Sequence, residues 1–542
     1  MTSISDPRVR AAAPFAGAAL LMIATRLSVL WRFPPFLDES LYATWAMRVH
    51  DSVNDRFVAL AYGKLPLLSW LGAGLVFAGA RPLDSVRLVS FVSGLVSLAV
   101  VAALAARLGG RPAAIATAFV YALMPLALVH DVIGIMEPLV TALLALALYL
   151  QLRLVERPSM SVALGLGLVM GAGLLTKETG EIALVLLPAS LLLFDWSGPQ
   201  LGRRVLVWAG DALVAVVLAG IAYLVVTLSD YWDDYPAARR SLGTFRDLGD
   251  GLSHPLRWLQ AEWRDYGTEL LGFATIPLLI ACVIGIVVAF GIRRRLAALY
   301  LLWLLVPLVV AILFLPNPFV RYLVPMTPML AVFAGVGIAA AWSFASTRFA
   351  RPRRPVAVAV VVVLAFVLAA VFDARVVANP ATAPYPGLSR DEYASGWAAG
   401  TGWRELANEL QRRAGAHKLV VASYAGLSDA LQLSLGDDPR IQIVSGQPGK
   451  SGPEATSDYV VENGTPLPAD PGYGVLARDW TYERPHHGTP LVLYRRGVQW
   501  QGRTYVTPDE LRAGLGLPDA DFDRFIAAHP DIGAWYRAMA SR

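Results

Sequence analysis

The sequence has almost no cysteine, since Cys282 is the only one among 542 residues. A single cysteine excludes an intramolecular disulfide, so any region exported from the cytosol has to fold without one. Charged residues are also scarce, at 16% of the chain against about 25% in ordinary soluble domains. Hydrophobic residues make up 56%, and the mean hydropathy is +0.52. Uncharged runs of membrane-spanning length recur between residues 12 and 373, which predicts a polytopic α-helical membrane protein.

The excess of basic over acidic residues is small, with 46 Lys+Arg against 41 Asp+Glu, a net charge of +5 and a pI near 9.2. A basic chain can indicate a nucleic-acid partner. Here the clustered arginines bracket apolar runs, so they are interpreted as topology signals. We expect membrane lipids and no nucleic acid among the partners.

A membrane span needs about 20 apolar residues. By that measure we expect about eleven spans, at 12–31, 86–106, 112–130, 136–152, 159–175, 180–195, 205–228, 269–291, 296–315, 320–343 and 355–372. The shorter stretch 66–80 is expected to be an interfacial or re-entrant helix. The first run lacks a small-residue cleavage pattern, so it is interpreted as a retained span.

Arginines gather in alternate loops, which the positive-inside rule places in the cytoplasm. They are Arg8, Arg10, Arg107, Arg111, Arg153, Arg157, Arg203, Arg204, Arg293, Arg294, Arg295, Arg348, Arg351, Arg353 and Arg354. The opposite loops hold Asp38, Glu39, Asp131, Glu137, Glu178 and Glu181. This segregation predicts a protein of the cytoplasmic (inner) membrane, with its N-terminus inside and its C-terminal region outside.

The long apolar runs end at about residue 373. We therefore divide the chain into a transmembrane part (1–373), a domain (374–499) and a helical tail (500–542). Short apolar strand patterns occur at 419–422, 441–444, 458–461, 474–477 and 491–494, and helical patterns occur at 403–410 and 429–435. Strands alternating with helices predict a small extracytoplasmic α/β domain with a partly parallel sheet. Thr507 to Glu510 has capping-box spacing and a proline at the first helical position.

Ionisable residues recur where apolar runs meet the outer loops, and charge near a membrane is costly unless it has a function. Asp38 and Glu39 follow the first span, and Lys64 opens the next apolar run. The other groups are His130, Asp131 and Glu137 in the second outer loop, Lys177 in a short hairpin, and Arg321 with Tyr322 at a span end. Each residue alone has a plainer explanation, such as snorkelling for Lys64 or helix capping for Glu178 and Glu181.

Together, acids and bases at the membrane surface suit a substrate that is both an anion and a lipid. Lys64 and Arg321 could hold a phosphate, because the planar fork of arginine suits bidentate contact. A nearby carboxylate could take the proton of an attacking hydroxyl.

These segments together resemble the membrane glycosyltransferases of the GT-C superfamily, and they are similar to protein O-mannosyltransferases and the lipid-A aminoarabinose transferase. The matching segments are Asp38-Glu39 with Tyr42, Gly63-Lys64-Leu65-Pro66, His130 to Pro138, Lys177, and Arg321 to Pro325. The resemblance covers roughly residues 12–345. The order and spacing of the segments carry it rather than any single motif.

The resemblance implies a role for each candidate residue. Asp38 would be the catalytic base and Glu39 would support it. Lys64, Arg321 and Lys177 would bind the phosphate of a polyprenyl-phosphate sugar. The second acidic loop facing the acceptor would comprise His130, Asp131 and Glu137, and the pocket would include Tyr42, Tyr322 and His254 of the outer loop 229–268.

One residue departs from the family pattern, since Leu65 stands where the family often has proline, and this leaves the local turn open. The family also leaves the cofactor open. Some of its members bind a divalent metal between two acidic loops, while closer relatives manage without one.

The sequence is therefore interpreted as an inverting glycosyltransferase. It would move a hexose or pentose from a polyprenyl-phosphate donor to a hydroxyl of a protein, glycan or lipid acceptor at the outer face of the membrane. The alternative is a secondary transporter or lipid-linked-sugar flippase, a class that tends to show internal repeats. No convincing repeat is found in this sequence. A membrane-anchored binding protein would leave the charged loops without a role.

Overall fold

The computed structural model describes residues 7–198, 200–243, 246–349, 353–414, 418–424, 427–436, 438–446, 457–464 and 475–540. Arg351 and Gly474, named above, lie outside these ranges. The chain divides into two compact units. The first comprises Met1–Phe33 and Tyr42–Ser389, and the second comprises Pro34–Leu41 and Arg390–Arg542.

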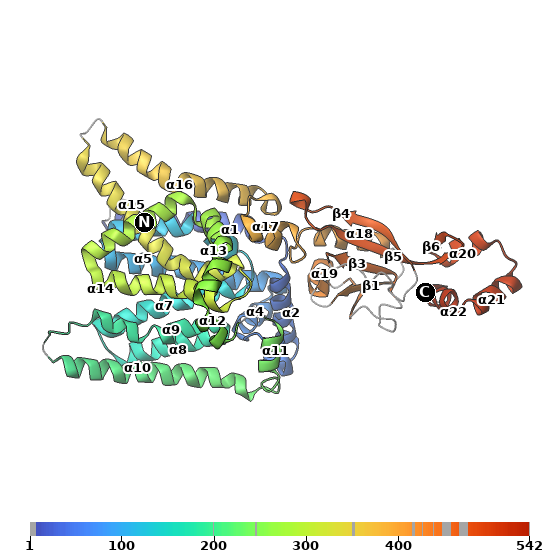
Figure 1. The fold of residues 1–542 in the computed structure, drawn as a ribbon, viewed down its shortest axis with the longest axis horizontal. Helices are drawn as coiled ribbons and strands as arrows, with labels where there is room; N and C mark the ends of the chain where they lie inside the picture. Colours follow the sequence, from blue (N-terminus) through green and yellow to red (C-terminus); the bar gives the residue numbers. More distant parts are fainter. Residues whose placement is uncertain are drawn as a thin grey trace. The chain divides into compact units, whose positions relative to one another are not determined.

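The first unit is helical throughout its described residues (Figure 1). Its α-helices are α1 (Pro7–Leu30), α2 (Leu37–Asp51, whose first turn belongs to the second unit), α3 (Val58–Ala61), α4 (Leu67–Phe77), α5 (Pro82–Ala122), α6 (Pro125–Asp131), α7 (Met136–Glu156), α8 (Met160–Thr176), α9 (Ile182–Val185), α10 (Leu201–Leu224), α11 (Tyr235–Ser241), α12 (Leu248–Ser253), α13 (Pro255–Ala274), α14 (Ile276–Phe314), α15 (Thr327–Arg348), α16 (Arg354–Ala378) and α17 (Gly387–Arg390). Short 3₁₀ helices include η2 (Glu178–Glu181), η3 (Pro188–Leu193) and η5 (Val320–Met326).

Among the described residues, seven helices are long and apolar enough to cross a membrane. They are Ala11–Leu30, Pro82–Ala122, Met136–Glu156, Leu201–Leu228, Ile276–Phe314, Val320–Arg348 and Pro355–Ala378. The expected polytopic helical fold with a C-terminal α/β region is therefore confirmed. The number of eleven spans stays a prediction.

Helix α5 contains two of the expected spans, because the chain leaves helical geometry at Gly109 and Gly110, where Gly110 has a φ of 72°. The structure shows that the two halves fold back on each other. Gly94 packs against Asp131, while Arg26 joins Asp131 to the carbonyl of Tyr121. A straight helix would separate Gly94 from Tyr121 by about 40 Å. In α14, a non-helical Arg293 likewise falls between the expected spans 269–291 and 296–315.

Several expected spans differ from continuous α-helices. In 269–291, Thr275 has a φ of 60° and separates α13 from α14. The stretch 180–195 consists of the short helices η2, α9 and η3. Here Gly180 packs directly on the backbone of Gly173, and Pro188 starts a new element. The stretch 112–130 is interrupted after Ala122, because Pro125 lacks the N–H group that would continue the helical hydrogen bonds.

The boundary of the first unit falls at Ser389, so the expected boundary at residue 373 lies inside it. Hydrogen bonds hold the end of α16 and the segment after it to this unit. The Ser389 hydroxyl donates to Glu269 Oε2 at 2.5 Å, and the Arg32 guanidinium donates to the carbonyls of Val377 and Ala378 at 2.8 and 2.7 Å.

Small residues set the packing of neighbouring helices. Helix α8 packs between α7 and α10, and the three lie side by side in Figure 1. A Cβ at Gly167 would be 2.8 Å from the carbonyl oxygen of Ala215, and one at Gly171 would be 2.7 Å from Ala222 Cβ. This is the close approach that small residues three or four positions apart allow between membrane helices.

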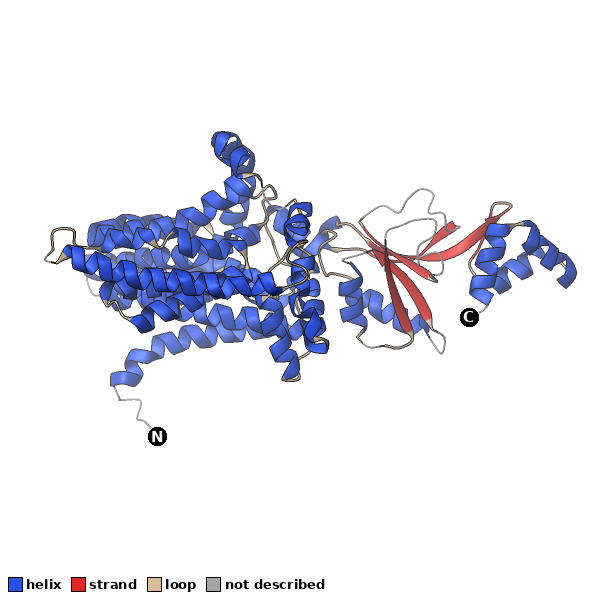
Figure 2. Cartoon of the chain, turned by 90° about the horizontal axis from the view of Figure 1, so that it is seen from below, coloured by secondary structure: helices blue, strands red, loops and turns tan. Residues whose placement is uncertain are grey.

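The second unit contains a six-stranded sheet with strand order β2-β1-β3-β5-β4, to which β6 adds beside β5 (Figure 2). The elements are η7 (Asp391–Ser395), α18 (Trp403–Ala414), β1 (Leu419–Tyr424), α19 (Leu427–Leu435), β2 (Ile441–Gly446), β3 (Tyr459–Asn463), β4 (Val475–Tyr482), β5 (Leu491–Trp500) and β6 (Arg503–Tyr505). Strands β2, β1 and β3 are parallel, while β3, β5, β4 and β6 pair antiparallel. The expected partly parallel sheet is confirmed.

The end of the second unit has a core of its own. It is built by α20 (Pro508–Leu515), α21 (Asp519–Ala528) and α22 (Pro530–Ala540) with the end of β5 and β6. Phe522 and Trp535 are buried there with Tyr505. The Thr507 hydroxyl accepts from the Glu510 N–H at 3.1 Å, so half of the expected capping box is present. Glu510 instead accepts from the Val506 N–H at 2.9 Å.

We expect Gly167→Ala to lower the stability of the first unit, because the added methyl group would press on the backbone of α10. Overpacking of this kind costs about 1–3 kcal/mol. The matched control is Gly165→Ala on the same helix, where the nearest atom to an added Cβ is 4.0 Å away. Thermal unfolding in detergent tests this, and equal melting temperatures for the two variants would contradict the packing described.

Candidate active site

A buried ion pair joins the start of α7 to the end of α8. Glu137 lies in the first turn of α7, and Lys177 is the extended residue that ends α8. The Lys177 Nζ is 2.5 Å from Glu137 Oε1, and the two side chains are 14% and 5% exposed. Burial lowers the pKa of Lys177, but the Glu137 carboxylate more than offsets this, so the pKa lies above that of an ordinary lysine. Lys177 is therefore a fixed positive charge at neutral pH.

Helix η5 adds an arginine and an aromatic ring to this pair. Lys177 Nζ lies 4.9 Å from the centre of the Tyr322 ring, and the guanidinium of Arg321 lies 4.6 Å from the centre of the Phe319 ring. Arg321 lies 5.8 Å from the centre of the Tyr322 ring that Lys177 also faces. The cluster of Glu137, Lys177, Arg321 and Tyr322 thus brings two basic side chains and one carboxylate together. Basic side chains bind anions through charge-assisted hydrogen bonds.

His130 lies at the end of α6 and is fully buried. Its Nδ1 is 2.7 Å from the carbonyl oxygen of Leu126, so Nδ1 carries the proton and donates it to the backbone. The ring meets Phe273 edge to face at 6.2 Å. The charge of Arg321 also acts on His130, which relates this residue to the same cluster.

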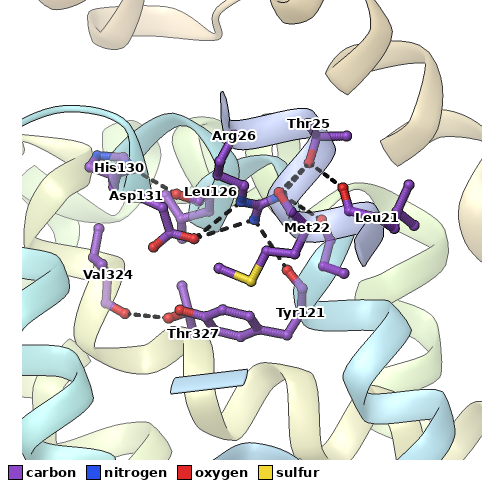
Figure 3. Close-up of polar contacts among 11 residues, drawn as sticks. Leu21, Met22, Thr25, Arg26, Tyr121, Leu126, His130, Asp131, Val324 and Thr327 are labelled. Carbon is purple, nitrogen blue, oxygen red and sulfur yellow. Dashed lines mark hydrogen bonds and ion pairs between the residues drawn. The ribbon is translucent and has the colours of Figure 1, made fainter. Parts of the chain in front are cut away.

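Asp131, next in the chain, forms a different pair. Figure 3 shows the Arg26 guanidinium directed at its carboxylate. Arg26 Nε and Nη2 are each 3.3 Å from Asp131 Oδ2, and both side chains are buried. Arg26 also donates to the carbonyls of Ala122 at 2.5 Å and Tyr121 at 3.5 Å. These carbonyls lie at the end of α5, where Pro125 has no N–H to offer, so Arg26 supplies the donors that the helix lacks.

The turn that carries Lys64 lies against α11. Gly63 has a φ of +66°, and a Cβ there would lie 2.7 Å from the backbone nitrogen of Arg239, so the turn requires glycine. The side chain of Arg239 pairs with Glu178 Oε1 at 3.4 Å, and the Tyr235 hydroxyl donates to the same oxygen at 3.3 Å. Burial raises the pKa of Tyr235, and the negative charge of Glu178 raises it further, so the phenol stays a donor.

Two neighbouring cavities border this turn. One of about 350 Å³ is lined by Leu65, Leu174, Glu178, Glu181, Leu184, Val185, Tyr223 and Arg239. The other, of about 570 Å³, shares Tyr223 and Arg239 and extends along Trp232, Tyr235, Pro236, Arg240, Arg246 and Asp247. Leu65 itself is buried in an apolar cluster with Phe57, Leu60 and Tyr235. This packing gives the leucine at the family's proline position a structural role.

Asp38 and Glu39 occupy the first turn of α2, and this turn belongs to the second unit. Glu39 is fully buried, and its Oε1 accepts a hydrogen bond from the Phe36 N–H at 2.8 Å. Glu39 therefore caps the helix that carries Asp38, as a carboxylate at the third helical position does in a capping box. The roles of both residues in catalysis stay predictions.

The remaining expected pocket residues lie in two places. Tyr42 is buried and packs edge to face on Trp45 at 5.4 Å, and Trp45 in turn packs on Tyr62 at 5.2 Å. His254 lies between α12 and α13, where its Nδ1 contacts Ser253 Oγ at 2.9 Å and Asp250 at 3.9 Å. Its side chain is 59% exposed, so these contacts are local.

The loop with Asp131 and Glu137 shows no metal site among the described residues. Within the described ranges, no group of three or more His, Cys, Asp or Glu side chains lies close enough together to hold a metal ion. The carboxylates of Asp131 and Glu137 are each neutralised by a basic side chain, Arg26 and Lys177. A divalent cation beside either carboxylate would meet the positive charge already bound there, so the residues present do not fit a metal.

Two residues of these clusters, Arg26 and Arg239, were not among the site residues predicted from the sequence. Arg26 had a usable signal, because it is a lone cation inside the apolar run 12–31, and such residues need a buried partner. Arg239 had a weaker one, because it follows an aromatic and acidic stretch in the outer loop 229–268. Its partner Glu178 is 61 residues away, and no local pattern links the two.

We expect Asp131→Asn to destabilise the protein, because Arg26 would lose the buried carboxylate with which it is paired. Breaking a buried ion pair on one side costs about 3–5 kcal/mol. The control is Asp84→Asn, which breaks a pair with the 78%-exposed Arg81, a kind of pair worth about 0–1 kcal/mol. Thermal unfolding in detergent compares the two, and equal losses would contradict a structural role for Asp131.

Comparison with known proteins agrees with this architecture. Residues 64–226 match the family described as dolichyl-phosphate-mannose-protein mannosyltransferase. No curated protein sequence matches the chain. The crystal structure of ArnT from Cupriavidus metallidurans in the apo state is similar with a TM-score of 0.54 and 18% identity, covering 89% of this chain and 97% of that chain.

Two further solved structures are similar. ArnT from the same organism bound to undecaprenyl phosphate has a TM-score of 0.53 and 16% identity, with the same coverage of both chains. The Archaeoglobus fulgidus oligosaccharyltransferase tethered with an acceptor peptide has a TM-score of 0.50 and 12% identity, covering 91% of this chain and 75% of that chain. At such low identities the likeness shows a shared fold. The resemblance to the GT-C superfamily of membrane glycosyltransferases is thereby confirmed for this chain's fold, and for its sequence within residues 64–226.

Proposed function

We propose that this protein is an inverting membrane glycosyltransferase. It transfers a sugar from a polyprenyl-phosphate donor to an acceptor hydroxyl at the outer face of the cytoplasmic membrane, with Asp38 as the general base. The family match over residues 64–226 and the fold shared with ArnT support the reaction class. That ArnT has been crystallised with undecaprenyl phosphate supports a polyprenyl-phosphate donor.

The observation that carries the proposal is the buried cluster of Glu137, Lys177, Arg321 and Tyr322. Lys177 is paired with Glu137, and both Lys177 and Arg321 lie against the Tyr322 ring, so two basic side chains meet in one place. A donor phosphodiester is an anion, which lysine and arginine side chains are suited to bind. Lys64, on the turn beside Arg239 and Glu178, is proposed as a further phosphate ligand.

The chemistry needs a base and a stabilised leaving group. The acceptor hydroxyl attacks the anomeric carbon, and its proton passes to the carboxylate of Asp38. The new glycosidic C–O bond forms as the bond between the anomeric carbon and the phosphate oxygen breaks. The released polyprenyl phosphate gains a second negative charge, which the fixed cations Lys177 and Arg321 stabilise. Direct displacement of this kind inverts the anomeric centre.

The proposed topology puts the reaction at the outer face of the cytoplasmic membrane. The arginine-rich loops face the cytoplasm, and the loops with Asp38, Glu137 and Lys177 face the exterior. A donor that is built on the inside and flipped would then meet the acceptor at the outer surface.

We expect Asp38→Asn to reduce sugar transfer by about 10²–10⁴-fold, the usual contribution of a positioned general base. Expression and thermal stability should be retained. Asp51→Asn, at the exposed other end of α2, is the matched control and should keep full activity. The assay follows the sugar from a radiolabelled polyprenyl-phosphate donor into product. Retained transfer in Asp38→Asn would remove the base assignment, and flux into sealed vesicles without any covalent product would favour the transporter alternative.

We expect Arg321→Gln to weaken binding of polyprenyl phosphate, because a charge-assisted contact contributes about 1.5–3 kcal/mol. That corresponds to roughly a 10- to 100-fold rise in Kd. Arg257→Gln on α13 is the control, since that side chain is exposed and contacts Trp258. Binding of the lipid phosphate, measured by competition against labelled donor, separates the two variants. Similar affinities would argue against the cluster as the phosphate site.

A further inference from the structure

The segment Pro34–Leu41, which carries Asp38, is held by the second unit of the chain. The Leu37 N–H donates to the carbonyl of Ala398 at 3.1 Å. Phe36 packs edge to face on Tyr393, with ring centres 5.4 Å apart. A Cβ at Gly400 would lie 2.0 Å from the carbonyl oxygen of Pro35, so the two backbones touch. The position of Asp38 within this unit therefore depends on the loop from Gly396 to Gly402.

This 396–402 loop has no regular structure, yet several of its carbonyl groups accept hydrogen bonds from side chains. Asn463 donates to the carbonyl of Trp397 at 2.6 Å. The Thr401 hydroxyl links the loop to the preceding segment, because it donates to the carbonyl of Ala394 at 2.7 Å. Ala399, Gly400 and Thr401 are buried. Buried backbone without such partners would lose about 1–3 kcal/mol for each unsatisfied group, so these donors decide the shape of the loop.

Arg484, just after β4, supplies most of the donors. Its side chain is 3% exposed. Its Nε donates to the carbonyl of Thr401 at 3.1 Å, Nη1 to that of Gly396 at 2.9 Å and Nη2 to that of Ala399 at 3.2 Å. Nη1 also donates to Thr489, at 3.2 Å. One guanidinium thus spans the loop and ties it to the sheet.

The choice of arginine follows from its geometry. The guanidinium presents its N–H donors in a rigid plane, while a lysine ammonium is a compact point charge with three rotatable donors. Lysine at this position could not reach Gly396, Ala399 and Thr401 in one plane. A buried arginine bound only to neutral carbonyls is costly to desolvate. Its presence here is accounted for by the loop that it holds.

We propose that Arg484 is a positioning residue for Asp38. It fixes the 396–402 loop, and the loop fixes the first turn of α2 through Ala398 and Gly400. This inference rests on the proposed function, because Asp38 is the base in that proposal. It assigns the second unit a role in turnover beyond any contact with the acceptor.

The test uses Arg484→Lys in the full-length protein, with Arg478→Lys as the matched control. Arg478 lies on the same strand β4 and is exposed, with a contact to Thr481. Hydrogen exchange of the peptide covering residues 34–41 should become several-fold faster in Arg484→Lys and stay unchanged in Arg478→Lys. In the transfer assay, kcat should fall by about 10- to 100-fold with KM for the donor unchanged, as expected for a misplaced catalytic group.

A double variant separates positioning from general damage. If Arg484 acts through Asp38, the residual activity of Asp38→Asn should not fall further when Arg484→Lys is added. The proposal is overturned if Arg484→Lys lowers the activity of Asp38→Asn by the same factor by which it lowers the activity of the unmodified protein. It is also overturned if hydrogen exchange of residues 34–41 is unchanged in Arg484→Lys. If exchange becomes faster while neither Arg484→Lys nor Asp38→Asn lowers kcat, the proposed function fails, and the positioning role falls with it.

A second variant covers the case in which Arg484→Lys does not fold. Gly400→Ala leaves Arg484 in place and adds a methyl group directly against Pro35. It should give the same faster exchange at residues 34–41 and the same loss of kcat. Full activity with unchanged exchange in Gly400→Ala would overturn the contact on which the proposal depends.

Discussion

The pairing of buried charges at the ends of apolar helices is the constraint on which the first unit depends. Arg26 and Asp131 are both buried, and either charge alone in that place would cost several kcal/mol. The pair can exist only if α1, the returning half of α5 and α6 meet at one point. Glu137 and Lys177 impose the same condition on α7 and α8. Packing of small residues such as Gly167 then brings the remaining helices into contact.

The two pairs differ in what surrounds them, and this difference separates structure from proposed function. Arg26 donates hydrogen bonds to Asp131 and to the carbonyls at the end of α5, so its charge stabilises the fold. Lys177 has one carboxylate partner, while Arg321 adds a second cation beside it. Asp131 and Glu137 lie in one loop, and we propose that they have different roles. The proposed phosphate site lies beside the second pair.

The second unit is tied to the proposed chemistry through its own core. Its sheet and helices α18 and α19 bury a cluster that includes Trp403, Leu431 and Leu493, and Leu37 of the Asp38 segment packs against it. The 396–402 loop lies between that core and the segment. A carboxylate that takes a proton has to be held in position, and a buried loop fixed by Arg484 and Asn463 can do this.

The sequence by itself determined the fold class, the partly parallel sheet and the resemblance to membrane glycosyltransferases, because apolar run length, strand periodicity and motif order are local or sequential properties. The reversal at Gly109 and Gly110 was likewise readable from two runs of spanning length. Only the tertiary structure decided which charges meet: it paired Asp131 with Arg26, 105 residues away, and Glu137 with Lys177, 40 residues away. It also brought Arg484 into contact with the 396–402 loop, and this loop contacts the segment that carries Asp38. Partners this distant are selected by burial and by the direction of side chains in a packed interior, and neither quantity is encoded in the spacing of residues along the chain.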